Sequence, residues 1–220
     1  SDVYKRQEPN KVGYVVEIDP LNPNSTPKKH TALGRFKHEN AELVISKDGK
    51  IIVYMGDEER GEYLYKYVSN ERINEVKDKS TLLSNGNLYV AKFNDNFTGE
   101  WLLLDTQTTG FSSKAEVCIF TRLAASKVGA TTMDRPEWIA SNPKKNEVCC
   151  CLTNNKNRGI KTNKGGDKVD VDKVNPRKNN KYGQIVRWKP RDNNHSSVYF
   201  EWDLFVVAGN PNVHDDNLSL

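Results

Sequence analysis

Short runs of β-branched and aromatic residues alternate with polar turns along most of the chain, a pattern that predicts strands rather than helices. The turns are rich in Gly, Pro, Asn and Asp, and Lys47-Asp48-Gly49 is typical of a tight hairpin. A short helix is indicated only at 115–126, and 70–78 is interpreted as a charged loop. The expected strands are 13–20, 41–46, 50–55, 61–68, 86–93, 100–104, 137–140, 147–152, 182–188 and 198–207. We therefore expect an all-β sandwich, barrel or propeller.

A weak internal repeat favours the propeller. Residues 41–54 align with residues 136–149, with one extra residue in the second turn. Each copy leads to a further strand, 61–67 in the first and 182–188 in the second. Repeated antiparallel units are typical of propeller blades, whose inner strands line a central channel. The repeat thus predicts a partial β-propeller built of antiparallel blades.

Composition narrows the functional classes. The 220 residues include 33 Lys and Arg against 29 Asp and Glu, giving a net charge of +4, and 36% are hydrophobic. No window approaches the roughly 18 consecutive apolar residues of a membrane span, so we expect no stable membrane insertion. Disordered, collagen-like and coiled-coil classes are also excluded.

The positive charge is concentrated in residues 156–181, which we call the basic segment. It holds nine Lys and Arg against three Asp, a local charge of +6, so the rest of the chain carries −2. Such a stretch is usually a solvated loop and less often one that attracts anions. No aromatic residue lies among its charges, so we expect no nucleic-acid binding. We expect a monomer.

Several catalytic and metal-binding patterns are missing from the sequence. The cysteines are Cys118 and the run Cys149, Cys150 and Cys151, with no C-x-x-C spacing. Because adjacent residues of a strand point to opposite faces, the run is interpreted as ordinary small strand residues. The four histidines lack metal-binding spacing, and no G-x-S-x-G elbow is present.

Two clusters of charged residues are candidates for binding chemistry. Lys37-His38-Glu39-Asn40 precedes a strand and is either a surface loop or part of a site. Asp57-Glu58-Glu59-Arg60 follows the first hairpin. Three successive carboxylates repel one another, so they are either screened by water or bound to a hard cation such as Ca²⁺.

The third candidate is Met133-Asp134-Arg135-Pro136-Glu137-Trp138. Side chains two apart on an extended chain share a face, so Arg135 and Glu137 are expected to point the same way. This pairing suits a phosphate held by the planar guanidinium beside a metal held by the carboxylate. An internal ion pair is the equally open alternative. From the repeat, Glu39 or Glu42 of the first copy is expected at about the same height in the fold as Arg135 and Glu137.

Taken together in order, these motifs resemble the PhoX family of bacterial alkaline phosphatases. The similarity runs from about residue 13 to residue 209. It rests on residues 13–20, 32–39, 53–60, 88–93, 133–138 and 202–205, among them Gly56-Asp57-Glu58-Glu59-Arg60 and Met133-Asp134-Arg135-Pro136-Glu137-Trp138.

The resemblance implies a secreted β-propeller hydrolase of phosphomonoesters, exported by the twin-arginine route to the periplasm or the extracellular space, with a cluster of Fe³⁺ and Ca²⁺. By motif, Glu39 and Glu137 would be metal ligands, Asp57 or Glu58 calcium ligands, and Arg135 a phosphate-binding residue; Arg135 and Glu137 would be catalytic. The alternative is a calcium-stabilised propeller that serves binding or adhesion without catalysis. Arg135 beside Glu137 distinguishes the two, since a structural calcium site has no use for a guanidinium.

The two ends of the chain resemble translated sequencing adapter. We interpret residues 1–7 and 218–220 as non-native and residues 8–217 as part of a single, incomplete β-propeller domain. The resemblance places the iron-binding cysteine and a Cys-Glu-Glu segment before Gly13, where this sequence has no counterpart. We therefore expect a fragment that is inactive alone.

Overall fold

The computed structural model describes residues 8–210 and residue 212. The interpretations of residues 1–7 and 218–220 lie outside the described residues. None of the described helices has the length and apolar character needed to span a membrane.

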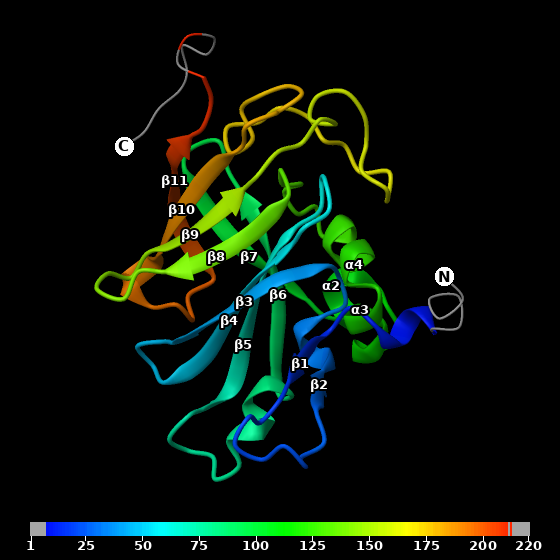
Figure 1. Cartoon of the computed structure of the whole chain (residues 1–220), viewed down its shortest axis with the longest axis vertical. Helices are drawn as coiled ribbons and strands as arrows, with labels where there is room; N and C mark the ends of the chain where they lie inside the picture. The colour runs from blue at the N-terminus through cyan, green and yellow to red at the C-terminus, as the bar shows by residue number, and fades with distance from the viewer. Residues whose placement is uncertain (1–7, 211, 213–220) are drawn as a thin grey trace.

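Nine of the strands form one antiparallel sheet in the order β3-β4-β5-β6-β7-β11-β10-β9-β8, and β1 and β2 form a separate pair (Figure 1). Each expected strand is present, and β2 is one that the hydrophobic pattern missed. The strands are β1 Val15–Glu17, β2 Lys28–His30, β3 His38–Ile45, β4 Lys50–Asp57, β5 Leu64–Arg72, β6 Gly86–Phe93, β7 Thr98–Leu104, β8 Pro136–Ser141, β9 Val148–Leu152, β10 Gln184–Pro190 and β11 Tyr199–Val207.

The sheet curls until its two edge strands, β3 and β8, lie side by side. The Asn40 side chain donates to the Ile139 carbonyl at 2.8 Å and accepts from the Ile139 amide at 3.0 Å. Glu42 Oε1 accepts from the Ser141 amide at 2.8 Å. Side chains thus cover strand edges that would otherwise be open to pairing with other chains.

The all-β prediction is confirmed, and the nearly closed antiparallel sheet is consistent with a propeller-like fold. The two copies of the repeat form the three-stranded units β3-β4-β5 and β8-β9-β10, which meet at the seam between β3 and β8. Backbone pairing is continuous from β3 to β8, so the blades are not separated by breaks in the sheet.

Strands β4 and β5 are buried on both faces. Ile52, Tyr54 and Leu64 belong to a core inside the curled sheet, while Val53 and Tyr65 belong to a second core on the opposite face. The second core is covered by the helices that Figure 1 shows beside the sheet. Two-sided burial explains why β4 has the continuous apolar sequence typical of a central strand.

The expected helix at 115–126 is two helices instead of one. The helical segments are α2 Thr106–Thr109, α3 Lys114–Ile119 and α4 Thr121–Lys127, with short 3₁₀ turns η1 Pro9–Lys11, η2 Thr31–Leu33, η3 Lys79–Leu83 and η4 Arg191–Asn193. Phe120, between α3 and α4, has the non-helical angles φ −104° and ψ 43°. The Cys118 carbonyl accepts from the Arg35 amide and the Thr121 hydroxyl at 2.9 and 2.8 Å. The Cys118 carbonyl thus bonds to these two donors instead of to the backbone amide one helical turn further along the chain.

The basic segment lacks regular strands but is firmly anchored. Arg158 is fully buried; it pairs with Asp134 at 2.7 Å and donates to the carbonyls of Thr132 and Asp170, both at 2.8 Å. Asp134 also accepts from Asn180 at 2.9 Å. The expectation of a solvated loop is therefore wrong for this part, because a buried ion pair ties the segment to the residue before Arg135.

Candidate functional site

Arg135 lies immediately before β8 in a strained backbone conformation. Its φ of +52° is in the left-handed region, which residues with a side chain rarely adopt. Two hydrogen bonds hold the preceding chain against the turn after β4, from Gly61 N to Met133 O at 3.0 Å and from Met133 N to Glu62 O at 2.8 Å. A Cβ on Gly56 would lie 2.6 Å from the Pro136 carbonyl oxygen, so glycine permits this close approach. Strain of this kind is often found at functional sites.

The Arg135 guanidinium brings two of the candidate carboxylates together. Its Nη2 lies 3.0 Å from Glu137 Oε1 and also pairs with Glu58 Oε1, while Nε donates to the Glu58 carbonyl at 3.1 Å. Thr153 donates to Glu137 Oε1 at 2.8 Å. Arg135, Glu58 and Glu137 remain 18%, 29% and 26% exposed. The group is thus ordered yet open to a small ligand.

Asp57 and Glu39 do not join this group. Asp57 is buried, and Arg122 from α4 holds both of its oxygens, at 2.6 and 2.7 Å. Burial, the largest influence, raises the pKa of Asp57, although Arg122 acts in the opposite direction. Glu39 is exposed on β3, and its side chain makes no hydrogen bond or ion pair within residues 8–210. Their roles as metal ligands stay predictions.

The described residues supply only part of a metal-binding set. No group of three or more His, Cys, Asp or Glu among them is arranged to hold a metal ion. Glu58 and Glu137 converge, but Ca²⁺ takes six to eight oxygens. Cys150 is a buried free thiol in β9, and burial raises its pKa, which opposes the thiolate that an iron site requires. The interpretation of this cysteine as an ordinary strand residue agrees with that environment.

Sequence reasoning missed a buried charged cluster beside the candidate site. Glu62 is 2% exposed, its Oε2 lies 3.6 Å from Arg122 Nε, and this oxygen has no hydrogen-bond partner within the described chain. Burial raises the pKa of Glu62 to about 8, although the charge of Arg122 acts in the opposite direction. In the sequence, only the excess of acidic residues around Glu62 could have indicated an arginine partner.

This cluster predicts a dependence of stability on pH. Unfolded, Glu62 titrates near its ordinary pKa; folded, it titrates near pH 8, so the folded state binds the extra proton between those values. The free energy of unfolding is therefore expected to fall as pH rises through this window and then to level off. Glu62→Gln should remove most of that slope. The melting temperatures at pH 5 and pH 9 measure this slope. For a chain of this size, 1 kcal/mol corresponds to about 2–4 °C. An unchanged slope in the variant would contradict the assignment.

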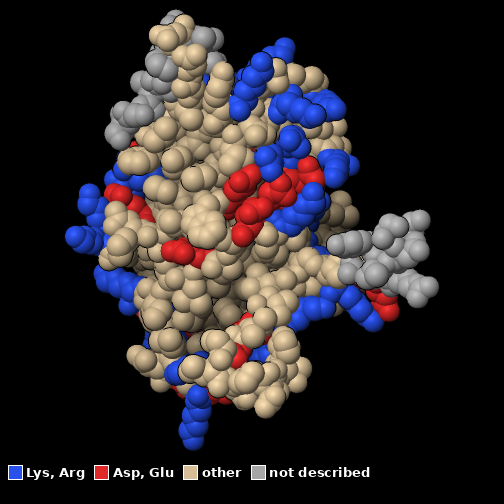
Figure 2. Space-filling model, viewed as in Figure 1, with Lys and Arg blue, Asp and Glu red and all other residues tan. Residues whose placement is uncertain are grey.

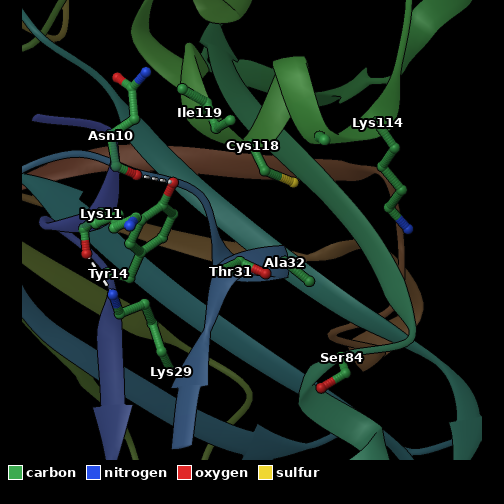
Figure 3. Close-up of a pocket in the computed structure, with 11 residues that line it drawn as sticks. Asn10, Lys11, Tyr14, Lys29, Thr31, Ala32, Ser84, Lys114, Cys118 and Ile119 are labelled. Atoms are coloured by element: carbon green, nitrogen blue, oxygen red, sulfur yellow. Dashed lines mark hydrogen bonds between the residues drawn. The ribbon is translucent and has the colours of Figure 1, made fainter. Parts of the chain in front are cut away.

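A separate cavity of about 510 Å³ lies between the N-terminal segment and α3, and it does not include Arg135 (Figure 3). Two of its lysines are already bound to backbone carbonyls: Lys114 Nζ donates to Gly86 O at 2.7 Å, and Lys29 Nζ donates to Lys11 O. Tyr14 donates to the Asn10 carbonyl at 3.1 Å. With these donors engaged, we assign this cavity no chemistry.

Comparison with known proteins identifies the family. No curated protein matches the chain. The solved structure of Pseudomonas fluorescens PhoX in complex with vanadate, a transition state analogue, is similar, with 50% sequence identity and a TM-score of 0.85; the match covers 95% of this chain and 38% of that one. The model of the family "Alkaline phosphatase PhoX" matches residues 2–219. This chain therefore belongs to the alkaline phosphatase PhoX family.

Proposed function

We propose that this chain forms part of a metal-dependent phosphatase that hydrolyses phosphomonoesters, with Arg135 binding the phosphoryl group. The observation that carries the proposal is the Arg135 guanidinium, held between Glu58 and Glu137 on a strained backbone and still accessible to solvent. The 50% identity to a protein solved with vanadate, a transition state analogue, supports it. A binding propeller would have no comparable need for an accessible guanidinium.

The contacts of Arg135 suggest how it acts. Glu58 holds Nε and Nη2 through its carbonyl and carboxylate, whereas Nη1 has only a long contact of 3.4 Å to Thr153. The Nη1 hydrogens are thus the most readily offered to a phosphoryl oxygen. Because Glu58 fixes the guanidinium in advance, little reorganisation is needed when negative charge develops in the transition state.

We further propose Ca²⁺ and Fe³⁺ as cofactors, with Glu58 and Glu137 as two of the oxygen ligands and Glu39 as a third. Bound cations would polarise the phosphoryl oxygens and activate an oxygen nucleophile. Asp57 could bind Ca²⁺ only after releasing Arg122. A periplasmic or extracellular location and a monomeric state complete the proposal.

Chelation should test the function directly. The protein expressed from its full gene is expected to hydrolyse p-nitrophenyl phosphate, and a calcium chelator should lower the rate at least about tenfold. Adding back calcium with iron should restore the rate, which controls for irreversible unfolding. A folded protein that shows no hydrolysis with both metals supplied would refute the phosphatase and favour the calcium-stabilised binding propeller.

A further inference from the structure

A second cavity, of about 350 Å³, lies between the turn after β4 and the start of the basic segment. Its charged lining consists of Glu59, Arg60, Lys156, Lys161 and Lys164. In Figure 2, acidic side chains gather at the middle of the visible face, with a cluster of lysines and arginines beside them. The cavity is therefore lined by four cations and a single carboxylate.

The one carboxylate of the lining is already neutralised. Glu59 Oε2 pairs with Lys37 Nζ at 2.7 Å and with Lys164 Nζ at 2.8 Å. The negative charge of Glu59 is thus shared between two ammonium groups, which leaves the other cations of the lining without compensation from it.

The other cations lack counterions. The ammonium groups of Lys156 and Lys161 make no ion pair or hydrogen bond in the described part of the chain. Arg60 Nε is buried, and among the described residues it has no hydrogen-bond partner. A buried donor without a partner is unfavourable, and a bound anion would satisfy it. The cavity thus has positive charge available for a ligand.

The walls of the cavity are fixed before any ligand arrives. The Asn163 side chain donates to the Gly61 carbonyl and to Asp167, both at 3.0 Å. The Gly159 amide donates to Val169 O at 2.6 Å, next to the buried Arg158. Because the lysines project from an anchored segment, binding an anion would order few additional groups.

The cavity adjoins the Arg135 site through two segments. Glu58, which contacts Arg135, is followed directly by Glu59 and Arg60, which line the cavity. Arg60 also forms an isolated antiparallel bridge with Asp134, the residue before Arg135. A molecule bound at Arg135 could therefore extend a second group toward the lysines.

We propose that this cavity binds a second anionic group of the substrate, so that phosphomonoesters carrying a further phosphate or carboxylate are preferred over esters with a neutral remainder. The inference rests on the proposed function and names a substrate class for it. The lysine and arginine side chains named above are sufficient to bind the second anionic group.

Matched substrates and matched variants test the proposal. Glycerol 3-phosphate and 3-phosphoglycerate share a three-carbon skeleton and differ in one carboxylate. Lys156→Ala/Lys161→Ala is expected to lower kcat/KM for 3-phosphoglycerate by about three- to tenfold and to change that for glycerol 3-phosphate less than about twofold. The control Lys47→Ala/Lys144→Ala removes two exposed lysines from hairpin turns and should alter neither value. Equal losses on both substrates, or no loss, would overturn the proposal.

Calorimetric titration with inorganic tripolyphosphate separates failure of the cavity from failure of the proposed function. The Lys156→Ala/Lys161→Ala variant is expected to bind tripolyphosphate about three- to tenfold more weakly than the unchanged protein or the control variant. This readout requires no catalysis, so it holds even if neither ester is hydrolysed. Equal affinity in all three proteins would overturn the cavity assignment.

Discussion

Replacing Arg135 with Lys is expected to lower kcat/KM for a phosphomonoester by about 10²-fold, with both weaker binding and slower turnover. Lysine keeps the positive charge but loses the planar fork that contacts the Glu58 carbonyl and the two carboxylates. A flexible ammonium in this place would need to reorganise as charge develops on the phosphoryl oxygens. Steady-state kinetics with p-nitrophenyl phosphate measures the change.

A matched control exists elsewhere in the sheet. Arg187 on β10 is also partly exposed and donates to both oxygens of Asp203, including Nε to Oδ1 at 3.0 Å. Arg187→Lys should change the kinetics less than about twofold because the residue does not contact the candidate site. A stable Arg135→Lys protein with full activity would exclude the proposed role of Arg135.

The strands were predictable because their signals are local. The hairpin Lys47-Asp48-Gly49 joins β3 and β4 as expected, with Gly49 at φ +82°. The pairing of Arg135 with Glu137 was expected from side chains two apart on an extended chain, but Arg135 precedes β8 with φ +52°, so its left-handed backbone and not the strand rule sets its direction. Glu58 joins them from 77 residues away, and only the resemblance had linked it to the same site.

Long-range contacts explain what the sequence could not reveal. Arg122 of α4 and Asp57 at the end of β4 are 65 positions apart, and the break at Phe120, between α3 and α4, has no clear signal in the hydrophobic pattern. Lys66 in β5 is also held by long-range contacts: it is fully buried, and its Nζ donates to Ser197 O at 2.7 Å. Composition does not show that backbone carbonyls will take the place of water around a lysine ammonium group.

The basic segment was misread for a related reason. Its high content of Gly, Asn and Lys suggested solvation, but Asn163, Asn175 and Asn180 are buried and hydrogen bonded. Amide side chains provide both donors and acceptors, so they can satisfy backbone groups where no strand does. A polar composition therefore does not distinguish a solvated loop from one held by a buried network.

The buried pair Arg158 and Asp134 is expected to dominate the stability of that network. Arg158→Ala should lower the free energy of unfolding by about 3–5 kcal/mol, because it leaves Asp134 charged and buried without its main partner. Urea denaturation of the chain measures the loss. Arg72→Ala, which removes a surface pair with Glu75 at 3.1 Å, is the control and should cost less than about 1 kcal/mol.

A double variant separates the buried charge from lost packing. Arg158→Met combined with Asp134→Asn leaves no charge at this buried position, and the asparagine keeps an oxygen that can accept from Asn180. We expect this protein to recover a substantial part of the stability lost in Arg158→Ala. An Arg158→Ala protein within about 1 kcal/mol of the original would mean that the segment is held mainly by its amide contacts. In that case the cavity between the turn after β4 and the basic segment should also persist in Arg158→Ala, since Asn163 and Gly61 would be its principal anchor.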